Sequence, residues 1–202
     1  MIRTLLISFL ASTILMSANA LNIPGVGGLG GGGRSGASIG AVFDEYIFSY
    51  TKALEGNSLI AEALGLHELA GELKAEAGKL EEGEVKLKAV SKVDKAGQEK
   101  IEERLSQAEA LGPEKKELVV AGSTEYAQSA ISLVAIVNKV KNLQRPGLHQ
   151  LNQLHKFKAL STLPGYVTRM AKILPQYRQL MEKNEIPPPP AMSEAGDALG
   201  SF

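Results

Sequence analysis

Apolar residues recur at steps of three and four along residues 38–184, which is the spacing of one face of an α-helix. The first stripe consists of Ile39, Phe43, Tyr46, Tyr50 and Leu54. Gly56-Asn57 after it predicts the end of that helix, and Asn57 or Ser58 would cap a second helix over residues 59–80. We expect the aromatic members of the first stripe to lie in the core.

The third apolar segment, residues 87–111, contains a signal for an interruption. Ser91 followed by Asp94 is a weak variant of the capping box that starts helices, so two interpretations stay open: the segment is broken near residue 91, or it is one continuous helix. Gly112 ends the segment. Pro113 suits the first turn of the next helix, because the backbone N–H that proline lacks has no partner there.

The segment over residues 118–140 is apolar around more than half of its circumference, which is typical of a helix at the centre of a bundle. Pro146-Gly147 predicts the start of a short fifth helix, and Pro164 predicts the start of a sixth, which contains Pro175. The sustained alternation of apolar and polar residues that marks a strand does not occur. The sequence therefore predicts an all-α helical bundle of about five or six helices.

The two ends of the chain differ in composition from this helical domain. Residues 1–20 combine a positive start, an apolar stretch too short to span a bilayer and a small-x-small pattern, so we expect a signal peptide cleaved after Ala20 and a periplasmic or secreted protein. Residues 21–37 are rich in glycine and predict a flexible leader. The helical domain should span residues 38–184, and a Pro-rich disordered tail should follow over 185–202.

Small residues interrupt the stripe of the second segment at Gly65, Ala70, Gly71, Ala77 and Gly78. A glycine inside an exposed helix costs about 1 kcal/mol relative to alanine. We interpret these positions as places where a neighbouring helix packs closely. The alternative interpretation is a helix that unfolds or slides when the protein inserts into a membrane.

The net charge of +0 conceals a segregation along the chain. Residues 44–125 hold 18 acidic and 11 basic residues, a net of −7, whereas residues 126–183 hold one acidic and nine basic residues, a net of +8. Either the two halves pack together and neutralise each other, or the basic half binds an anionic partner. The candidate partner-binding residues are Lys139, Lys141, Arg145, Lys156, Lys158, Arg169, Lys172 and Arg178.

Residue types that carry catalysis or bind metals are sparse. The chain has no Cys, which removes thiol chemistry, and His67, His149 and His155 lack the i,i+4 spacing of helical metal ligands. The pattern Gly-x-Ser-x-Gly occurs once, at residues 36–40, but the Gly-rich run before it is not the strand that a nucleophile elbow requires. A phosphate-binding Gly-Lys-Ser/Thr loop does not occur. We therefore expect no catalytic residue, no cofactor and no metal, and the wide spread of the basic residues argues against nucleic acid as a partner.

These observations predict an exported, non-enzymatic helical bundle that acts by binding. Its partner would be a protein or an anionic envelope surface, recognised by the basic C-terminal half or by an apolar groove between helices. Two alternatives stay open. One is a membrane-active protein that rearranges amphipathic helices, including the apolar region 118–143, and the other is a structural subunit of an envelope complex.

Overall fold

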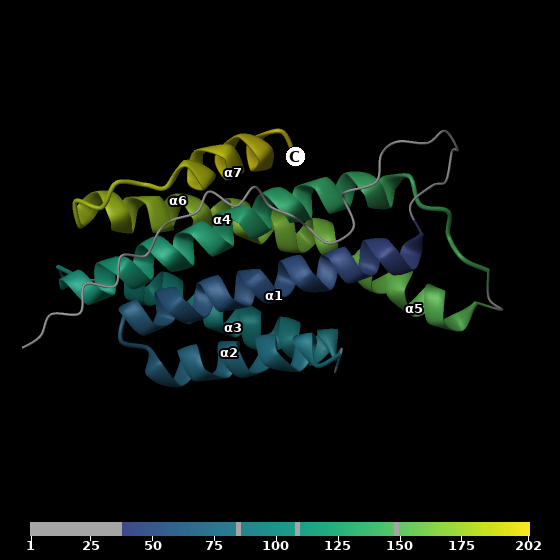
Figure 1. The fold of residues 1–202 in the computed structure, drawn as a ribbon, viewed down its shortest axis with the longest axis horizontal. Coiled ribbons are helices and arrows are strands. Elements are labelled where there is room, and N and C mark those ends of the chain that lie inside the picture. The colour runs from purple at the N-terminus through teal and green to yellow at the C-terminus, as the bar shows by residue number, and fades with distance from the viewer. Residues whose placement is uncertain (1–37, 84–85, 108–109, 148–149) are drawn as a thin grey trace, which may run out of the picture. The chain divides into compact units, whose positions relative to one another are not determined.

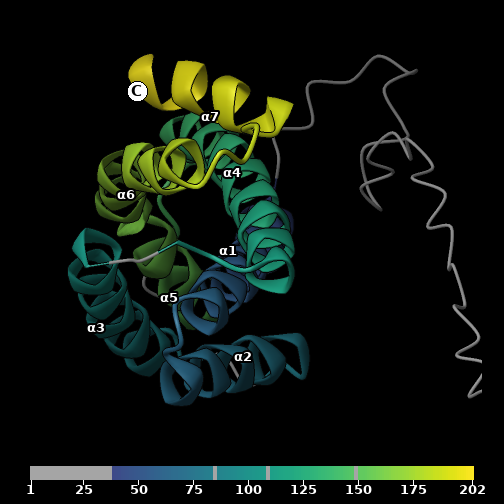
Figure 2. The same ribbon diagram turned by 90° about the vertical axis from the view of Figure 1, so that its left-hand side faces the viewer.

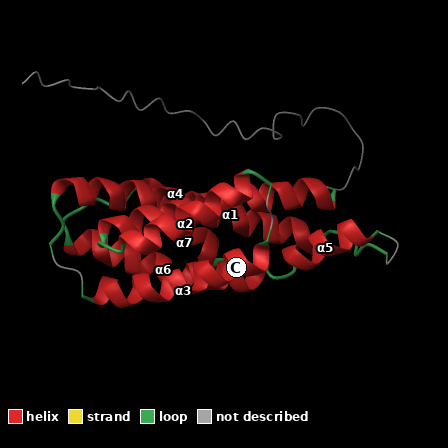
Figure 3. Cartoon of the chain, turned by 90° about the horizontal axis from the view of Figure 1, so that it is seen from below, coloured by secondary structure: helices red, strands yellow, loops and turns green. Residues whose placement is uncertain are grey.

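The computed structural model describes residues 38–202 apart from 84–85, 108–109 and 148–149, and seven helices lie within this part of the chain (Figure 1). They are α1 (Ile39–Ala63), α2 (His67–Glu81), α3 (Leu87–Ser106), α4 (Pro113–Lys141), α5 (Leu151–Leu160), α6 (Leu163–Lys183) and α7 (Pro190–Gly200). The described residues contain no strand (Figure 3), and the predicted all-α bundle is confirmed. The predicted signal peptide and leader, residues 1–37, lie outside the described residues.

Five of the helices form a closed ring around the core. α1 packs along α4, α4 against α6, α6 against α3 and α3 against α2, and α2 returns to α1 (Figure 2). α5 packs on α1, and α7 lies on α4 and α6. The apolar face of α4 is buried against three neighbouring helices, which is the covered position that its composition predicts.

α1 and α4 approach each other closely where each helix has a glycine. A Cβ atom on Gly56 would lie 2.7 Å from the carbonyl oxygen of Gly122 and 2.9 Å from the backbone nitrogen of Tyr126. A Cβ atom on Gly122 would in turn lie 2.7 Å from the carbonyl oxygen of Gly56. Interiors are close-packed, so any larger side chain at either position would push the two backbones apart.

The predicted helix end at Gly56-Asn57 is wrong, because α1 continues without interruption to Ala63. Both residues are buried by other helices, and this tertiary packing overrides their local tendency to stop a helix. The turn to α2 comes later, where Gly65 has a φ of +78°, a conformation that glycine adopts without strain.

Of the two interpretations left open at Ser91, the continuous helix is the one observed, since α3 runs without a break from Leu87 to Ser106. Asp94 does not cap a helix. Its side chain is buried and accepts hydrogen bonds from Tyr50 and other core residues. The chain is instead interrupted between α2 and α3, before the third apolar segment begins.

The small residues of α2 have two different roles. Ala70 and Ala77 are buried, as expected for close helix packing. At Gly71 and Gly78, however, an added Cβ atom would meet nothing within 4 Å. The close-packing interpretation is therefore wrong for these two glycines, and the structure gives no packing reason for either.

The C-terminal tail is ordered, in contrast to the disorder predicted for residues 185–202. Residues Pro190–Gly200 form α7, which buries Met192, Ala195 and Leu199 and packs on α4 and α6. α6 ends at Lys183, before the polyproline run begins. The last residue of that run, Pro190, opens a new helix, where proline is tolerated. The helix starts expected at Pro113 and Pro164 are found, whereas α5 begins only at Leu151.

The contact between Gly56 and Gly122 can be tested by adding one methyl group. Gly56→Ala should lower the free energy of unfolding by about 1–3 kcal/mol, because the new Cβ overlaps backbone atoms of α4 that cannot move independently. Gly71→Ala is the matched control and should raise stability by up to about 1 kcal/mol, because its Cβ meets open space within a helix. Chemical denaturation measures both changes, and equal effects of the two variants would contradict the close approach.

Candidate functional site: a tyrosine-lined pocket beside a buried carboxyl

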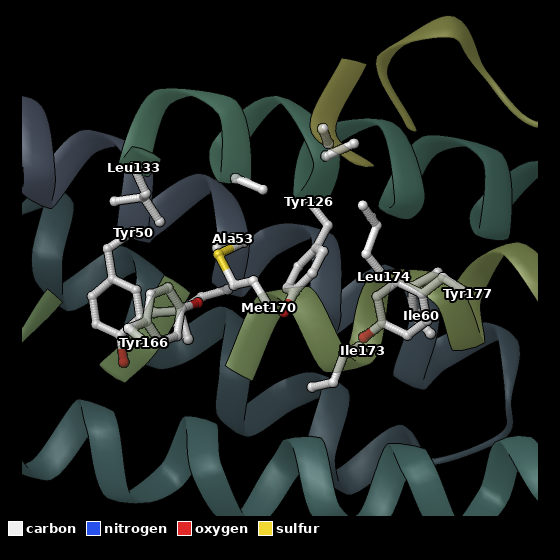
Figure 4. Close-up of a cluster of buried hydrophobic side chains, with 14 of the residues drawn as sticks. Tyr50, Ala53, Ile60, Tyr126, Leu133, Tyr166, Met170, Ile173, Leu174 and Tyr177 are labelled. Atoms are coloured by element: carbon white, nitrogen blue, oxygen red, sulfur yellow. The ribbon is translucent and has the colours of Figure 1, made fainter. Parts of the chain in front are cut away.

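All five tyrosines of the chain lie in the core, each at most 5% exposed. The rings of Tyr46 and Tyr50 stack with centroids 5.7 Å apart, and the ring of Tyr166 meets that of Tyr50 edge-on at 4.7 Å. Tyr126 and Tyr177 form a second edge-on pair at 5.2 Å (Figure 4). These aromatic contacts join α1, α4 and α6.

Asp94 of α3 is the polar centre of this region and has 0% exposure. Its carboxylate accepts hydrogen bonds from the Tyr50 hydroxyl at 3.4 Å, from Asn57 Nδ2 at 3.3 Å and from Gln98 Nε2 at 3.3 and 3.4 Å. The Tyr177 hydroxyl donates to Asn57 Oδ1 at 2.7 Å. The resulting network connects α1, α3 and α6 inside the ring of helices.

The environment of Asp94 favours its protonated form. Burial raises the pKa of the carboxyl to about 7, although the positive charge of Arg169 and the hydrogen bonds from Asn57, Tyr50 and Gln98 oppose this rise. Burial also raises the pKa of every tyrosine, and the negative charge of Asp94 adds to the effect. The phenols therefore keep their protons, and those of Tyr50 and Tyr177 act as neutral donors.

A pocket of about 470 Å³ opens next to this network, between α1, α3, α5 and α6. We call it the tyrosine pocket because the side chains of Tyr46, Tyr50 and Tyr166 line it, together with apolar residues such as Leu87. Its volume lies within the range of small-molecule sites. Tyr50 both lines the pocket and donates to Asp94, so one phenol separates the buried carboxyl from the pocket.

Three cationic side chains from three different helices line the tyrosine pocket. They are Lys88 of α3, Lys158 of α5 and Arg169 of α6, and His155 lies beside them. No Asp or Glu is among the lining residues. The pocket therefore has a positive potential that its own walls do not neutralise.

Arg169 is held over the ring of Tyr166, with the guanidinium carbon 5.2 Å from the ring centroid. Its Nε atom is buried and has no hydrogen-bond partner among the described residues, and the same is true of the Tyr166 hydroxyl. A buried donor without an acceptor costs about 1–3 kcal/mol. Two residues that line the pocket thus each bury a polar atom whose bonding capacity the described chain does not use.

Three of the predicted partner-binding residues are instead paired with carboxylates. Lys139 pairs with Glu45 of α1, Lys156 lies 3.8 Å from Asp44 of α1, and Arg178 lies 3.2 Å from Glu182 within α6. The first two pairs join the basic half to the acidic half, as expected if the halves neutralise each other. Such exposed pairs contribute only about 0–1 kcal/mol each.

The other predicted residues do not share one surface site. Lys141 donates to Asn138 and lies 5.9 Å from the ring centroid of Phe202. Arg145 lines a separate pocket of about 500 Å³ near the start of α1, and Lys172 is exposed on α6. Of the eight candidates, the structure brings only Lys158 and Arg169 together in the tyrosine pocket.

Sequence reasoning missed the remaining members of this site. Lys88 belongs to the acidic half of the chain, Tyr46 and Tyr50 were expected only as core residues, and Tyr166 was not singled out. The weak signal available was Asp94, a charged residue three positions after Ser91, which was interpreted as a cap. Its burial becomes evident only when α1 and α6 are packed against α3.

No protein-family model, curated protein or solved structure matches this chain. Within the described ranges, no group of three or more His, Asp or Glu residues is arranged to hold a metal ion. His67 bonds to Glu62, and His149 lies outside the described residues. The candidate site is therefore defined by the geometry of the tyrosine pocket alone.

The raised pKa of Asp94 predicts an unusual dependence of stability on pH. Its carboxyl binds a proton more tightly in the folded chain, with a pKa of about 7 against an ordinary 3.8, so the folded state holds more protons between these values. The free energy of unfolding should therefore fall as pH rises from about 4 to 7, by up to about 1.4 kcal/mol per pH unit from this group, and level off above.

Asp94→Asn should remove this contribution, because the amide does not titrate. Urea denaturation across this pH range should show the variant gaining stability relative to the parent as pH rises. Asp197→Asn, on the exposed face of α7, is the control and should follow the parent. Parallel curves for the parent and Asp94→Asn would contradict a buried, protonated carboxyl.

Proposed function

We propose that this protein is exported and works as a non-catalytic binding protein for an anionic ligand held in the tyrosine pocket. The observation that carries the proposal is the convergence of Lys88, Lys158 and Arg169 on one pocket without an acidic lining residue. Elsewhere in the basic half, Lys139, Lys156 and Arg178 are paired with carboxylates. An anion entering the pocket would meet three cationic side chains and no lining carboxylate, although Arg169 also interacts with the buried Asp94.

The chemistry of the three cations supports an anionic ligand over a neutral one. Lys88 and Lys158 are exposed, so they can attract an anion without first losing their own hydration. Arg169 is half-buried and presents a planar guanidinium, which suits the two oxygens of a carboxylate, sulfonate or phosphate. Lys88 and Lys158 would thus attract the anion from a distance, and Arg169 would bind its oxygens directly.

Binding of an anionic fluorescent probe tests this proposal. Anilinonaphthalene sulfonate should bind the mature chain with one-to-one stoichiometry, whereas the uncharged phenylnaphthylamine should bind much more weakly. Lys158→Gln and Arg169→Gln should each weaken sulfonate binding at least about fivefold, the loss of about 1 kcal/mol of charge-assisted contact. Fluorescence titration gives both affinities.

Lys172→Gln is the matched control for these variants. It removes a positive charge from the same helix as Arg169, three residues further along, at an exposed position outside the pocket. Its affinity should stay within twofold of the parent, roughly the scatter expected when a distant exposed charge is removed. If all three variants weakened binding equally, the probe would be responding to net charge, and the pocket would not be the site.

The membrane-active alternative finds no specific support in the described structure. None of the helices in the described ranges has the length and hydropathy needed to span a bilayer. The apolar face of α4, on which that alternative depends, is covered by α1, α6 and α7. Dye leakage from anionic vesicles on addition of the mature chain would nevertheless favour it over the binding proposal.

Export is the second part of the proposal and has its own test. Expressed in a bacterial host, the chain should be recovered outside the cytoplasm with Leu21 as its first residue. Ala18→Arg should block cleavage, because signal peptidase requires a small residue there, whereas Asn19→Gln should be processed normally. Mass spectrometry distinguishes the two, and a cytoplasmic chain with residues 1–20 intact would contradict export.

A further inference from the structure

The cations of the tyrosine pocket belong to a longer row of positive charge that follows the boundary between α3 and α6. These two helices pack side by side (Figure 2). Lys88 of α3 and Arg169 of α6 both line the tyrosine pocket. Further along both helices, Gln176 Nε2 of α6 donates to Glu102 of α3 at 3.3 Å. The two helices therefore run in the same direction, with the pocket at one end of their boundary and this polar contact at the other.

Two exposed lysines extend the positive charge from the pocket along this boundary. Lys95 lies about two turns after Lys88 and about two turns before Glu102, so these three residues share one face of α3. Lys172 follows Arg169 by one turn and therefore lies on the same side of α6. Both helices thus place a further cation between the pocket and the contact that ends the boundary.

The lysines of this row have no carboxylate partner among the described residues. We define the basic row as Lys88, Lys95, Lys158, Arg169 and Lys172. All four lysines are exposed, and none takes part in an ion pair within the described part of the chain. Arg169 is half-buried and also interacts with the buried Asp94. The positive potential of the pocket therefore continues outward along the boundary of α3 and α6.

The basic row is a line of charge, which fits a chain of anionic groups better than a flat anionic surface. Glu99 and Glu103 are exposed on α3 just beyond Lys95, and Glu102 lies where the row ends. A membrane of anionic lipids laid across α3 would meet these carboxylates as well as the lysines, and like charges repel. A linear polyanion can follow the row and end before the carboxylates.

The walls of the pocket favour a polysaccharide over a nucleic acid. Single-stranded nucleic acids gain affinity when their bases stack on open aromatic faces. The three lining tyrosines are at most 5% exposed, and their rings are covered by one another and by the Arg169 guanidinium. Ser91 and Thr162 also line the pocket, and their hydroxyls can form hydrogen bonds with the hydroxyls of a sugar.

We propose that the ligand of this protein is a linear acidic polysaccharide, with one anionic group bound by Arg169 in the tyrosine pocket and the following groups beside Lys95 and Lys172. This inference rests on the proposed binding of an anion in the same pocket, and it adds the length and the repeating charge of the ligand. A single anion reaches only the pocket, whereas a chain of anionic groups reaches the whole basic row.

The length of the ligand separates this proposal from the binding of a single anion. A heparin hexasaccharide is a sulfated probe of defined length. In isothermal titration calorimetry at neutral pH, it should bind the mature chain at least about tenfold more tightly than a heparin disaccharide. Its affinity should also fall more steeply as the salt concentration rises, because it engages more cations. Uncharged maltohexaose should not bind measurably.

Variants at the far end of the basic row assign the additional affinity to that row. Lys95→Gln and Lys172→Gln should each weaken hexasaccharide binding about threefold, the effect of losing one exposed charge contact. Neither should change the affinity for anilinonaphthalene sulfonate more than about twofold, because that probe reaches only the pocket. Arg169→Gln should weaken the binding of both probes.

Lys100→Gln is the matched control for Lys95→Gln. It removes an exposed lysine from the same helix, but five residues further along, which places it on a different face of α3. Its affinity for the hexasaccharide should stay within about twofold of the parent. Circular dichroism should show the same helix content for all variants.

Each failure has its own meaning. If the two heparin fragments bind equally, or if Lys100→Gln is as damaging as Lys95→Gln, the polysaccharide inference is overturned, while the binding of a single anion stands as long as Arg169→Gln weakens it. If polyphosphate, single-stranded DNA or anionic vesicles bind more tightly than the hexasaccharide, the polysaccharide inference is likewise overturned. If no anion binds, or if Arg169→Gln and Lys158→Gln leave sulfonate binding unchanged, both proposals fail.

Discussion

The structure depends on keeping the carboxyl of Asp94 away from water. An isolated carboxylate in a protein interior is strongly disfavoured, so a carboxyl at 0% exposure must be neutral, hydrogen-bonded or compensated by a cation. Here all three apply. Tyr50 and Asn57 donate from α1, Gln98 donates from the next turn of α3, and Arg169 of α6 contributes positive charge. These contacts require α1, α3 and α6 to pack around the carboxyl of Asp94.

The close approach of α1 and α4 belongs to the same arrangement. Gly56 permits the two backbones to come together, and Asn57, the next residue, is thereby carried into the core. There Asn57 accepts from the Tyr177 hydroxyl and donates to Asp94. Gly56 and Asn57, whose local preferences are to end and to cap a helix, thus act together. Gly56 lets the α4 backbone approach, and Asn57 forms hydrogen bonds in the core that results.

The sequence predicted the parts of this fold that depend on local periodicity. Apolar residues three and four apart identify a helix wherever one face is buried, and this was sufficient for the all-α class and for the starts at Pro113 and Pro164. It failed at Gly56-Asn57 and at Asp94. Small and short polar residues have the same local preference for helix ends whether or not a neighbouring helix buries them. Only the tertiary partners decide between a cap and a core position.

The pocket was harder to predict than the fold for a related reason. The segregation of charge along the chain predicted a binding site in the basic half. Two lysines of that half, Lys139 and Lys156, instead lie against acidic residues of α1. The cation that completes the pocket, Lys88, comes from the acidic half. Net charge along the chain therefore described which helices attract one another, whereas the candidate site depends on which cations line one pocket after the helices have packed.

Arg169 links the buried carboxyl to the pocket, and this gives the two a common energetic basis. Its positive charge lowers the pKa of Asp94, so ionised Asp94 and an anion in the pocket would share one guanidinium. Because coupling between two binding equilibria is reciprocal, an anion that binds Arg169 would favour the protonated form of Asp94, and protonation of Asp94 would favour the anion. The protonation state of Asp94, which the hydrogen-bonded network influences, would thus change how strongly an anion binds in the proposed site.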